Sequence, residues 1–300
     1  MITKTTVFVL GAGASEPYGL PVGRALYQSV LDHCRVGNSG CIDILNTTPF
    51  TERHGTEFLG ELKYFGLSSV DAFLEKQPSF LEIGKAAIAA MLIVKEDNDA
   101  LWAVRDANWM MYLYGHMMAD TIEQFADNKI AFITFNYDRS LEHFLSVSLS
   151  KTYHKTLREC AAVFDRIPVI HLHGRLGSLP WQNENVGRDY NPIIDQHAMN
   201  VCLREIKIVH EDIADRDKDF QLAKKFLAEA ECVYLMGFGF GKKNVDRLGL
   251  AELFPKGNYL GTAYEASDLE MSRSRKLLGN RIGLYNCQSI QFLRNYASLE

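Results

Sequence analysis

Four short segments combine glycine with polar side chains, and each of them directly follows or ends a run of apolar residues. They read GAGAS at 11–15, TFNYD at 134–138, HLHG at 171–174 and GFGFG at 237–241. A glycine-rich turn after a strand lets backbone N–H groups approach a phosphate. Asparagine and aspartate can bind hydroxyl groups, and a histidine that titrates near neutral pH can act as a general base. These residue types suit a site for a phosphate-bearing ligand.

The apolar runs that must position these segments indicate an α/β fold. They are rich in β-branched residues and continuous rather than alternating, as strands buried on both faces are. The six runs cover residues 6–10, 130–135, 167–172, 232–238, 258–264 and 282–287. Helical patterns lie between most of them, for example at 219–231. This alternation predicts a doubly wound, mostly parallel, Rossmann-like sheet of six strands.

One interval is too long for a simple crossover between strands. Residues at about 35–128 contain no clear strand and have the texture of helices. We expect a helical insertion packed on the sheet, within a single domain that spans 1–300. The tryptophans and methionines of this interval are interpreted as core packing.

The first segment, GAGAS, fits a phosphate-binding turn that opens a helix. Gly11 and Gly13 permit the close approach of backbone, and Ser15 adds a hydroxyl group. The dinucleotide fingerprint requires a third glycine, but position 16 is Glu. The alternative is a tight turn that binds no ligand.

The second segment, TFNYD, places Thr134, Asn136 and Asp138 at the end of a predicted strand. Ligands of open α/β sheets bind outside the carboxyl ends of the strands. Asn136 and Asp138 are two residues apart, so both can point the same way in extended chain. The alternative is that they cap the helix that follows.

The third segment carries His171 and His173, which again are two residues apart beside a glycine. Such a pair also suits a metal, but the sequence offers no persuasive set of further ligands, so we expect no metal site.

In the fourth segment, Gly237 and Gly239 let the backbone come close to a ligand or to the first glycine turn. Asn244 and Asp246 could bond ribose hydroxyls. The alternative is a loop whose phenylalanines pack at the sheet edge.

Composition narrows the function classes. The formal charge of -5 argues against a general nucleic-acid binder, which usually carries a basic surplus. The six cysteines are scattered singly, which favours reduced thiols in a cytoplasmic protein over a zinc ribbon or a disulfide framework. No run of 18 apolar residues and no signal-peptide pattern occurs, so we expect no membrane association.

The order of the four segments resembles the sirtuin superfamily, and more narrowly the divergent sirtuin-like domains of bacterial anti-phage systems that deplete NAD. In that family the GAGxS loop holds the pyrophosphate and ribose of NAD, and the N-x-D pair approaches its nicotinamide end. The histidine before glycine acts on the nicotinamide ribose. A later glycine loop contacts the adenosine ribose. The resemblance therefore implies NAD-binding roles for Gly11, Ala12, Gly13, Ser15, Thr134, Gly237, Gly239 and Asn244, and catalytic roles for Asn136, Asp138 and His173.

Three departures from the family pattern bear on the activity. Protein-deacylating sirtuins usually carry two CxxC pairs on zinc, and this chain has none. Position 239 is Gly where the family usually has a hydroxyl residue. The segment after the first loop reads GLPVGRA, which leaves Arg24 as the match to the family's arginine.

The resemblance thus implies an NAD hydrolase that releases nicotinamide and ADP-ribose without a metal. Two alternatives stay open, namely an NAD or ADP-ribose sensor without turnover and an NAD-dependent protein deacylase. Because loss of NAD harms the host, such a domain is expected to be gated by homo-oligomerisation or by an activating partner protein.

Overall fold

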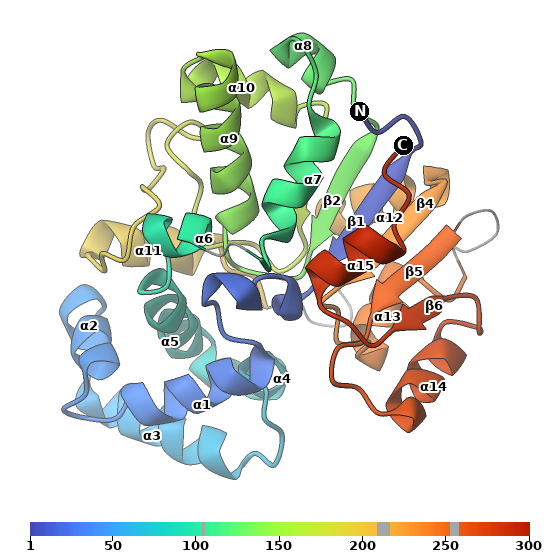
Figure 1. Ribbon diagram of the computed structural model, residues 1–300. Coiled ribbons are helices and arrows are strands. Elements are labelled where there is room, and N and C mark those ends of the chain that lie inside the picture. Colours follow the sequence, from blue (N-terminus) through green and yellow to red (C-terminus); the bar gives the residue numbers. More distant parts are fainter. Residues whose placement is uncertain (104–105, 209–216, 253–257) are drawn as a thin grey trace.

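The computed structural model describes residues 1–103, 106–208, 217–252 and 258–300. Its centre is a six-stranded, all-parallel sheet in the order β3-β2-β1-β4-β5-β6 (Figure 1). The predicted α/β fold with a doubly wound parallel sheet is confirmed. The strands are β1 (Thr6–Leu10), β2 (Ile130–Thr134), β3 (Val169–His171), β4 (Cys232–Met236), β5 (Asn258–Thr262) and β6 (Gly283–Tyr285).

The central strand shows why the apolar runs are continuous. All five residues of β1 are buried, and β1 pairs with β2 on one side and β4 on the other. Phe8 and Leu10 pack into one core cluster, whereas Val7 and Val9 pack into a second. Side chains of a strand alternate between the two faces of its sheet, so both faces must be apolar.

Helices cover both faces of the sheet. The cluster that contains Phe8 also receives side chains from α5, α7, α9 and α15, and the cluster that contains Val7 receives them from α12 and α13. The helices are α1 (Gly23–His33), α2 (Ser39–Thr47), α3 (Glu52–Tyr64), α4 (Val70–Lys76), α5 (Leu81–Ile93), α6 (Asn98–Ala103), α7 (Trp109–Met117), α8 (Ile122–Phe125), α9 (Ser140–Tyr153), α10 (Leu157–Phe164), α11 (Gln196–Glu205), α12 (Lys218–Glu229), α13 (Lys242–Leu248), α14 (Asp268–Leu277) and α15 (Ser289–Asn295).

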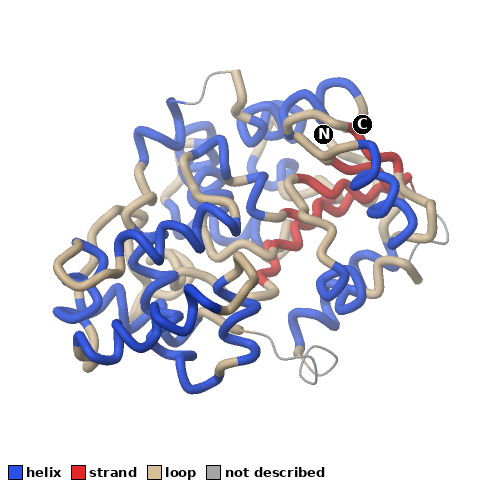
Figure 2. The backbone as a smooth tube through the Cα atoms, turned by 90° about the horizontal axis from the view of Figure 1, so that it is seen from below, coloured by secondary structure: helices blue, strands red, loops and turns tan. Residues whose placement is uncertain are grey.

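The long interval between α1 and β2 forms the helices α2 to α8 in its described part. Ten residues of α5 are buried, which makes this helix the centre of the group. In Figure 1 the helices α1 to α5 lie beyond the carboxyl ends of β1 and β2. Seen from below, the strands run side by side in one half of the molecule, and the largest group of helices fills the other half (Figure 2).

The strand order places two of the glycine segments beside each other. The chain builds β2 and β3 on one side of β1 and then returns to place β4 on the other side. The point between β1 and β4 is therefore the topological switch point, where open α/β sheets form a crevice for ligands. The loops that begin with Gly11 and Gly237 leave the sheet at this point.

Candidate active site

The loop after β1 and the loop after β4 pack against each other, and this contact explains why both contain glycine. Gly11 N–H donates to the Met236 carbonyl at 3.0 Å, and Gly13 N–H donates to the Gly237 carbonyl at 3.1 Å. A Cβ on Gly11 would lie 2.5 Å from the Gly237 oxygen, and one on Gly237 would lie 2.0 Å from the backbone nitrogen of Ala14. Gly237 also has a positive φ of 59°. The backbones approach so closely that no side chain fits between them.

The expectation that GAGAS opens an α-helix directly is wrong. The turn continues into two short 3-10 helices, Ala12–Ala14 and Glu16–Tyr18, and the first α-helix begins only at Gly23. Within the turn, the N–H groups of Ala14 and Ser15 already donate to carbonyls of the same turn. The Ala12 N–H makes no hydrogen bond to any described residue. The turn therefore offers a phosphate the free Ala12 amide instead of the N-terminus of an α-helix.

Asn136 joins the loop after β2 to the first glycine loop. Its Nδ2 donates to the Gly11 carbonyl and to Ser15 Oγ, both at 3.0 Å, and its backbone N–H donates to Thr134 Oγ1 at 3.0 Å. A carbonyl oxygen only accepts hydrogen bonds, so the side-chain nitrogen must face Gly11. The amide oxygen of Asn136 makes no hydrogen bond to the described residues. Asn136 thus presents an unused acceptor.

Asp138 is buried at the start of α9, with 9% of its surface exposed. Its Oδ1 accepts the Ser140 N–H at 3.1 Å, but the N-cap residue of α9 is Arg139, which makes no side-chain capping bond. Asn136 bonds back to the glycine loop. Burial raises the pKa of the Asp138 carboxyl, and hydrogen bonds from Ser15 and Ser140 offset only part of that effect.

A cavity of about 90 Å³ opens between these loops. It brings together four of the predicted site residues: Ala12, Ser15, Asn136 and Asp138. The rest of its lining comes from the start of α1, from α4 and α5, and from the residues that flank Asn136. These lining residues are Leu20, Pro21, Gly23, Leu26, Asp71, Leu92, Phe135 and Tyr137.

His173 lies against the residues on either side of Asn136. Its ring centroid is 5.4 Å from that of Phe135 and 6.2 Å from that of Tyr137. The Nε2 atom is buried and makes no hydrogen bond within the described part of the chain. Burial lowers the pKa of His173, although Asp71 acts in the opposite direction. A neutral imidazole with an unused nitrogen can accept a proton.

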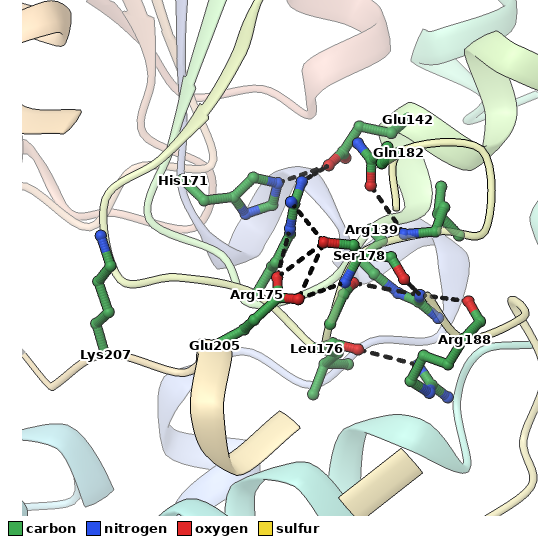
Figure 3. A network of polar contacts seen from close by, with 12 residues as sticks. Arg139, Glu142, His171, Arg175, Leu176, Ser178, Gln182, Arg188, Glu205 and Lys207 are labelled. Atoms are coloured by element: carbon green, nitrogen blue, oxygen red, sulfur yellow. Dashed lines mark hydrogen bonds and ion pairs between the residues drawn. The ribbon is translucent and has the colours of Figure 1, made fainter. Parts of the chain in front are cut away.

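The neighbouring His171 differs from His173 because both of its ring nitrogens contact protein oxygens. Its Nε2 lies 2.8 Å from Glu142 Oε1 (Figure 3). Its Nδ1 lies 3.0 Å from the Asn136 carbonyl oxygen. Burial raises the pKa of Glu142, but the adjacent His171 and Arg175 outweigh it, so the pKa lies below its usual range. Both ring nitrogens therefore lie within hydrogen-bond distance of an oxygen. His171 anchors the Asn136 backbone.

This arrangement leaves His171 without a nitrogen for a metal. Within the described ranges, no group of three or more His, Cys, Asp or Glu side chains could hold a metal ion.

The glycine after His173, Gly174, is explained by a close backbone contact. A Cβ on Gly174 would lie 1.8 Å from the Glu205 carbonyl oxygen, and its φ is 67°.

A second buried network fixes the start of α9. Arg139, which follows Asp138, donates to Glu96 Oε1 at 2.9 Å and to Glu96 Oε2 at 2.6 Å. It also donates to the carbonyl of Arg188 at 2.9 Å, while the Arg188 side chain reaches the same Glu96 carboxylate at 2.6 Å. The pair of arginines thereby ties the loop after β3 to the end of α5.

Eight of the twelve predicted site residues do not line the cavity, namely Gly11, Gly13, Arg24, Thr134, His173, Gly237, Gly239 and Asn244. Arg24 is exposed in the first turn of α1 and lies outside the cavity lining. A Cβ on Gly239 would meet no atom within 4 Å. Asn244 lies on α13, and its neighbour Asp246 pairs with Lys242 on the surface. Phe238, by contrast, is buried against Phe135 at 5.2 Å, as the alternative for this segment expected.

Two contacts to the loops were not predicted. The Asp71 carboxylate on α4 accepts the hydroxyl of Tyr137. The Trp109 indole on α7 donates to the Ala14 carbonyl at 2.7 Å and so holds the glycine loop from the helical segment. The sequence showed only helical texture around Asp71 and an apolar pattern around Trp109, because both roles depend on contacts across the fold.

No protein-family model matches the chain, and no curated protein is significantly similar to it in sequence. None of the helices in the described part of the chain has the length and apolar composition that a membrane span requires.

Proposed function

We propose that this chain is an NAD hydrolase. Water adds to the anomeric carbon of the nicotinamide ribose as the bond to nicotinamide breaks, which yields nicotinamide, ADP-ribose and a proton. The observation that carries the proposal is the bridge from Asn136 to Gly11 and Ser15. It joins the loops after β2 and β1 at one cavity, with the unused nitrogen of His173 behind the same segment.

The reaction asks mainly for positioning and charge stabilisation. Nicotinamide departs as a neutral molecule while positive charge develops on the ribose. The free amide oxygen of Asn136 is an acceptor for a ribose hydroxyl or for the attacking water. Because Asn136 is held by its backbone through Thr134 and His171, this oxygen is fixed in place before the substrate binds.

His173 is proposed to take the proton from water or from a ribose hydroxyl. Its lowered pKa keeps the ring neutral at neutral pH, which a general base requires. Asp138 is proposed to bind the carboxamide of nicotinamide, and the free N–H of Ala12 to contribute to pyrophosphate binding.

The size of the cavity supports gating. Pockets that enclose small-molecule ligands measure roughly 300–1,000 Å³, several times the volume found here. The cavity itself can therefore hold only part of NAD, and the rest would lie outside it or require the surrounding residues to move. We propose a cytoplasmic, NAD-depleting effector of bacterial anti-phage defence that is switched on by self-assembly or by a partner protein.

The test is to incubate the purified chain with NAD at low and high protein concentration and to follow nicotinamide and ADP-ribose by chromatography. We expect release of both products by the wild type and loss of release in His173→Ala. His197→Ala, which changes an exposed histidine on α11, is the matched control. NAD binding without cleavage would favour the sensor, and nicotinamide release that depends on an acetyl-lysine peptide would favour the deacylase.

A further inference from the structure

Asp71 brings a carboxylate from the helical segment into the cavity. It is the second residue of α4, is half-buried, and lines the same cavity as Asn136 and Asp138. Its Oδ1 accepts the Tyr137 hydroxyl. Burial and the adjacent Asp71 hold the pKa of Tyr137 above its usual value, so the phenol stays protonated and donates. Tyr137 therefore fixes the orientation of the carboxylate.

The two aspartates of the cavity differ in how their oxygens are used. Asp138 is engaged by the Ser140 N–H and by the Ser15 hydroxyl. Asp71 has a second oxygen, Oδ2, that makes no hydrogen bond and no ion pair with the described residues. A carboxylate oxygen that is half removed from water gains most from a strong donor. Asp71 thus offers a ligand a carboxylate oxygen in addition to Asp138.

The position of Asp71 relative to His173 indicates which part of the ligand it meets. Among the charged groups that act on His173, Asp71 has the largest effect. Tyr137 contacts both, since it bonds Asp71 and lies 6.2 Å from the His173 ring. Asp71 and Asn136 line the cavity, and His173 packs against Phe135 and Tyr137, which form the wall between them.

We propose that Asp71 binds a ribose hydroxyl of the nicotinamide riboside, an inference that rests on the proposed NAD cleavage. Carboxylates are the usual acceptors of ribose hydroxyls in nucleotide sites. Asp71 is then a ribose-binding residue that the helical segment contributes to the site.

The experiment measures kcat/KM for NAD and for two analogues, which lack the 2′- or the 3′-hydroxyl of the nicotinamide ribose. We expect Asp71→Asn to lower kcat/KM for NAD by roughly 10- to 100-fold, the effect of losing a charged hydrogen bond. For the analogue that lacks the bound hydroxyl, the same substitution should change kcat/KM by less than about 3-fold. Asp165→Asn, at an exposed aspartate after α10, is the control.

The outcomes separate the two levels of the proposal. Equal losses on NAD and on both analogues, or no loss on NAD, would overturn the role of Asp71 while NAD cleavage stands. A wild type that neither binds nor cleaves NAD would overturn the proposed function itself. If Asp71→Asn does not fold, Asp71→Ser and the discrimination by the wild type between NAD and the analogues serve instead. A wild type that cleaves both analogues as fast as NAD would contradict the proposal.

Discussion

The side-chain nitrogen of Asn136 lies 3.0 Å from the carbonyl oxygen of Gly11, a residue 125 positions earlier in the chain. This contact fixes which end of the amide faces the glycine loop. It also explains why an asparagine is required, because an aspartate would set a carboxylate oxygen against a carbonyl oxygen.

Asn136→Asp is therefore expected to damage both stability and activity. Loss of the donor should lower the free energy of unfolding by about 1–3 kcal/mol, and NAD cleavage should fall about 100-fold. Denaturant unfolding and nicotinamide release measure the two effects. Asn185→Asp, at an exposed asparagine, is the control. An Asn136→Asp protein with wild-type stability would show that the contact with Gly11 contributes little.

The lowered pKa of His173 determines where the rate of NAD cleavage should fall in acid. A general base must be neutral, and burial lowers the folded-state pKa of this histidine below its usual value near 6.5. The rate should therefore be flat from about pH 6.5 upward and fall only as the pH drops through that lowered pKa. The stability that His173 contributes should be complete above about pH 6.5 and be lost over the same acid range. His173→Gln should remove both dependences, while His197→Gln keeps them. A rate that already declines below pH 7.5 would argue against His173 as the base.

Gly237 and Gly239 form a matched pair in one loop. Gly237 has a positive φ and lies against the backbone of Ala14, whereas a Cβ on Gly239 meets open space. Gly237→Ala is expected to destabilise the fold by about 3 kcal/mol or more, through strain and overpacking. Gly239→Ala should stay within about 0.5 kcal/mol of the wild type. Thermal unfolding of the two variants measures the difference. Equal melting temperatures would mean that the two glycine loops are not packed as described.

The lowered pKa of Glu142 should make the free energy of unfolding depend on pH in acid. The pKa of its carboxyl is held below the usual range in the folded state, so its contribution is present above about pH 4.3 and is lost as the pH falls through the lowered value. Glu142→Ala leaves the buried Nε2 of His171 without its hydrogen-bond partner and should cost about 1–3 kcal/mol at neutral pH. The difference in the free energy of unfolding between the wild type and Glu142→Ala should become smaller below pH 4. Chemical denaturation at pH 7 and pH 3.5 measures it, with exposed Glu123→Ala as the control. A difference that does not depend on pH would contradict the lowered pKa of Glu142.

The strands could be predicted because burial on both faces leaves a continuous apolar signal. The predicted run at 6–10 coincides with β1, and the other five runs each contain one strand and extend a few residues beyond it. Leu26, Val30 and Cys34 are spaced by four in the sequence and are buried on one face of α1 and at its end. These features depend on local periodicity, which one sequence displays.

The site could be predicted only in part. Asn136, Asp138, Ala12 and Ser15 follow strands, and parallel strands deliver their carboxyl ends to one edge of the sheet, so the cavity unites them. Asp71 and Trp109 reach the same loops from helices whose docking no local pattern specifies. The phosphate-binding turn was predicted from its glycines, but their close contacts are with the neighbouring loop, a role that local sequence cannot separate from ligand binding.

Nicotinamide release from NAD tests the central claim most directly. The wild type and Asn136→Ala should be compared at low and high protein concentration, with Asn185→Ala beside them. We expect stoichiometric nicotinamide and ADP-ribose from the wild type and from Asn185→Ala, and release at least about 100-fold slower from Asn136→Ala. Equal release by the wild type and Asn136→Ala, or a wild type that neither cleaves nor binds NAD at any concentration, would contradict it.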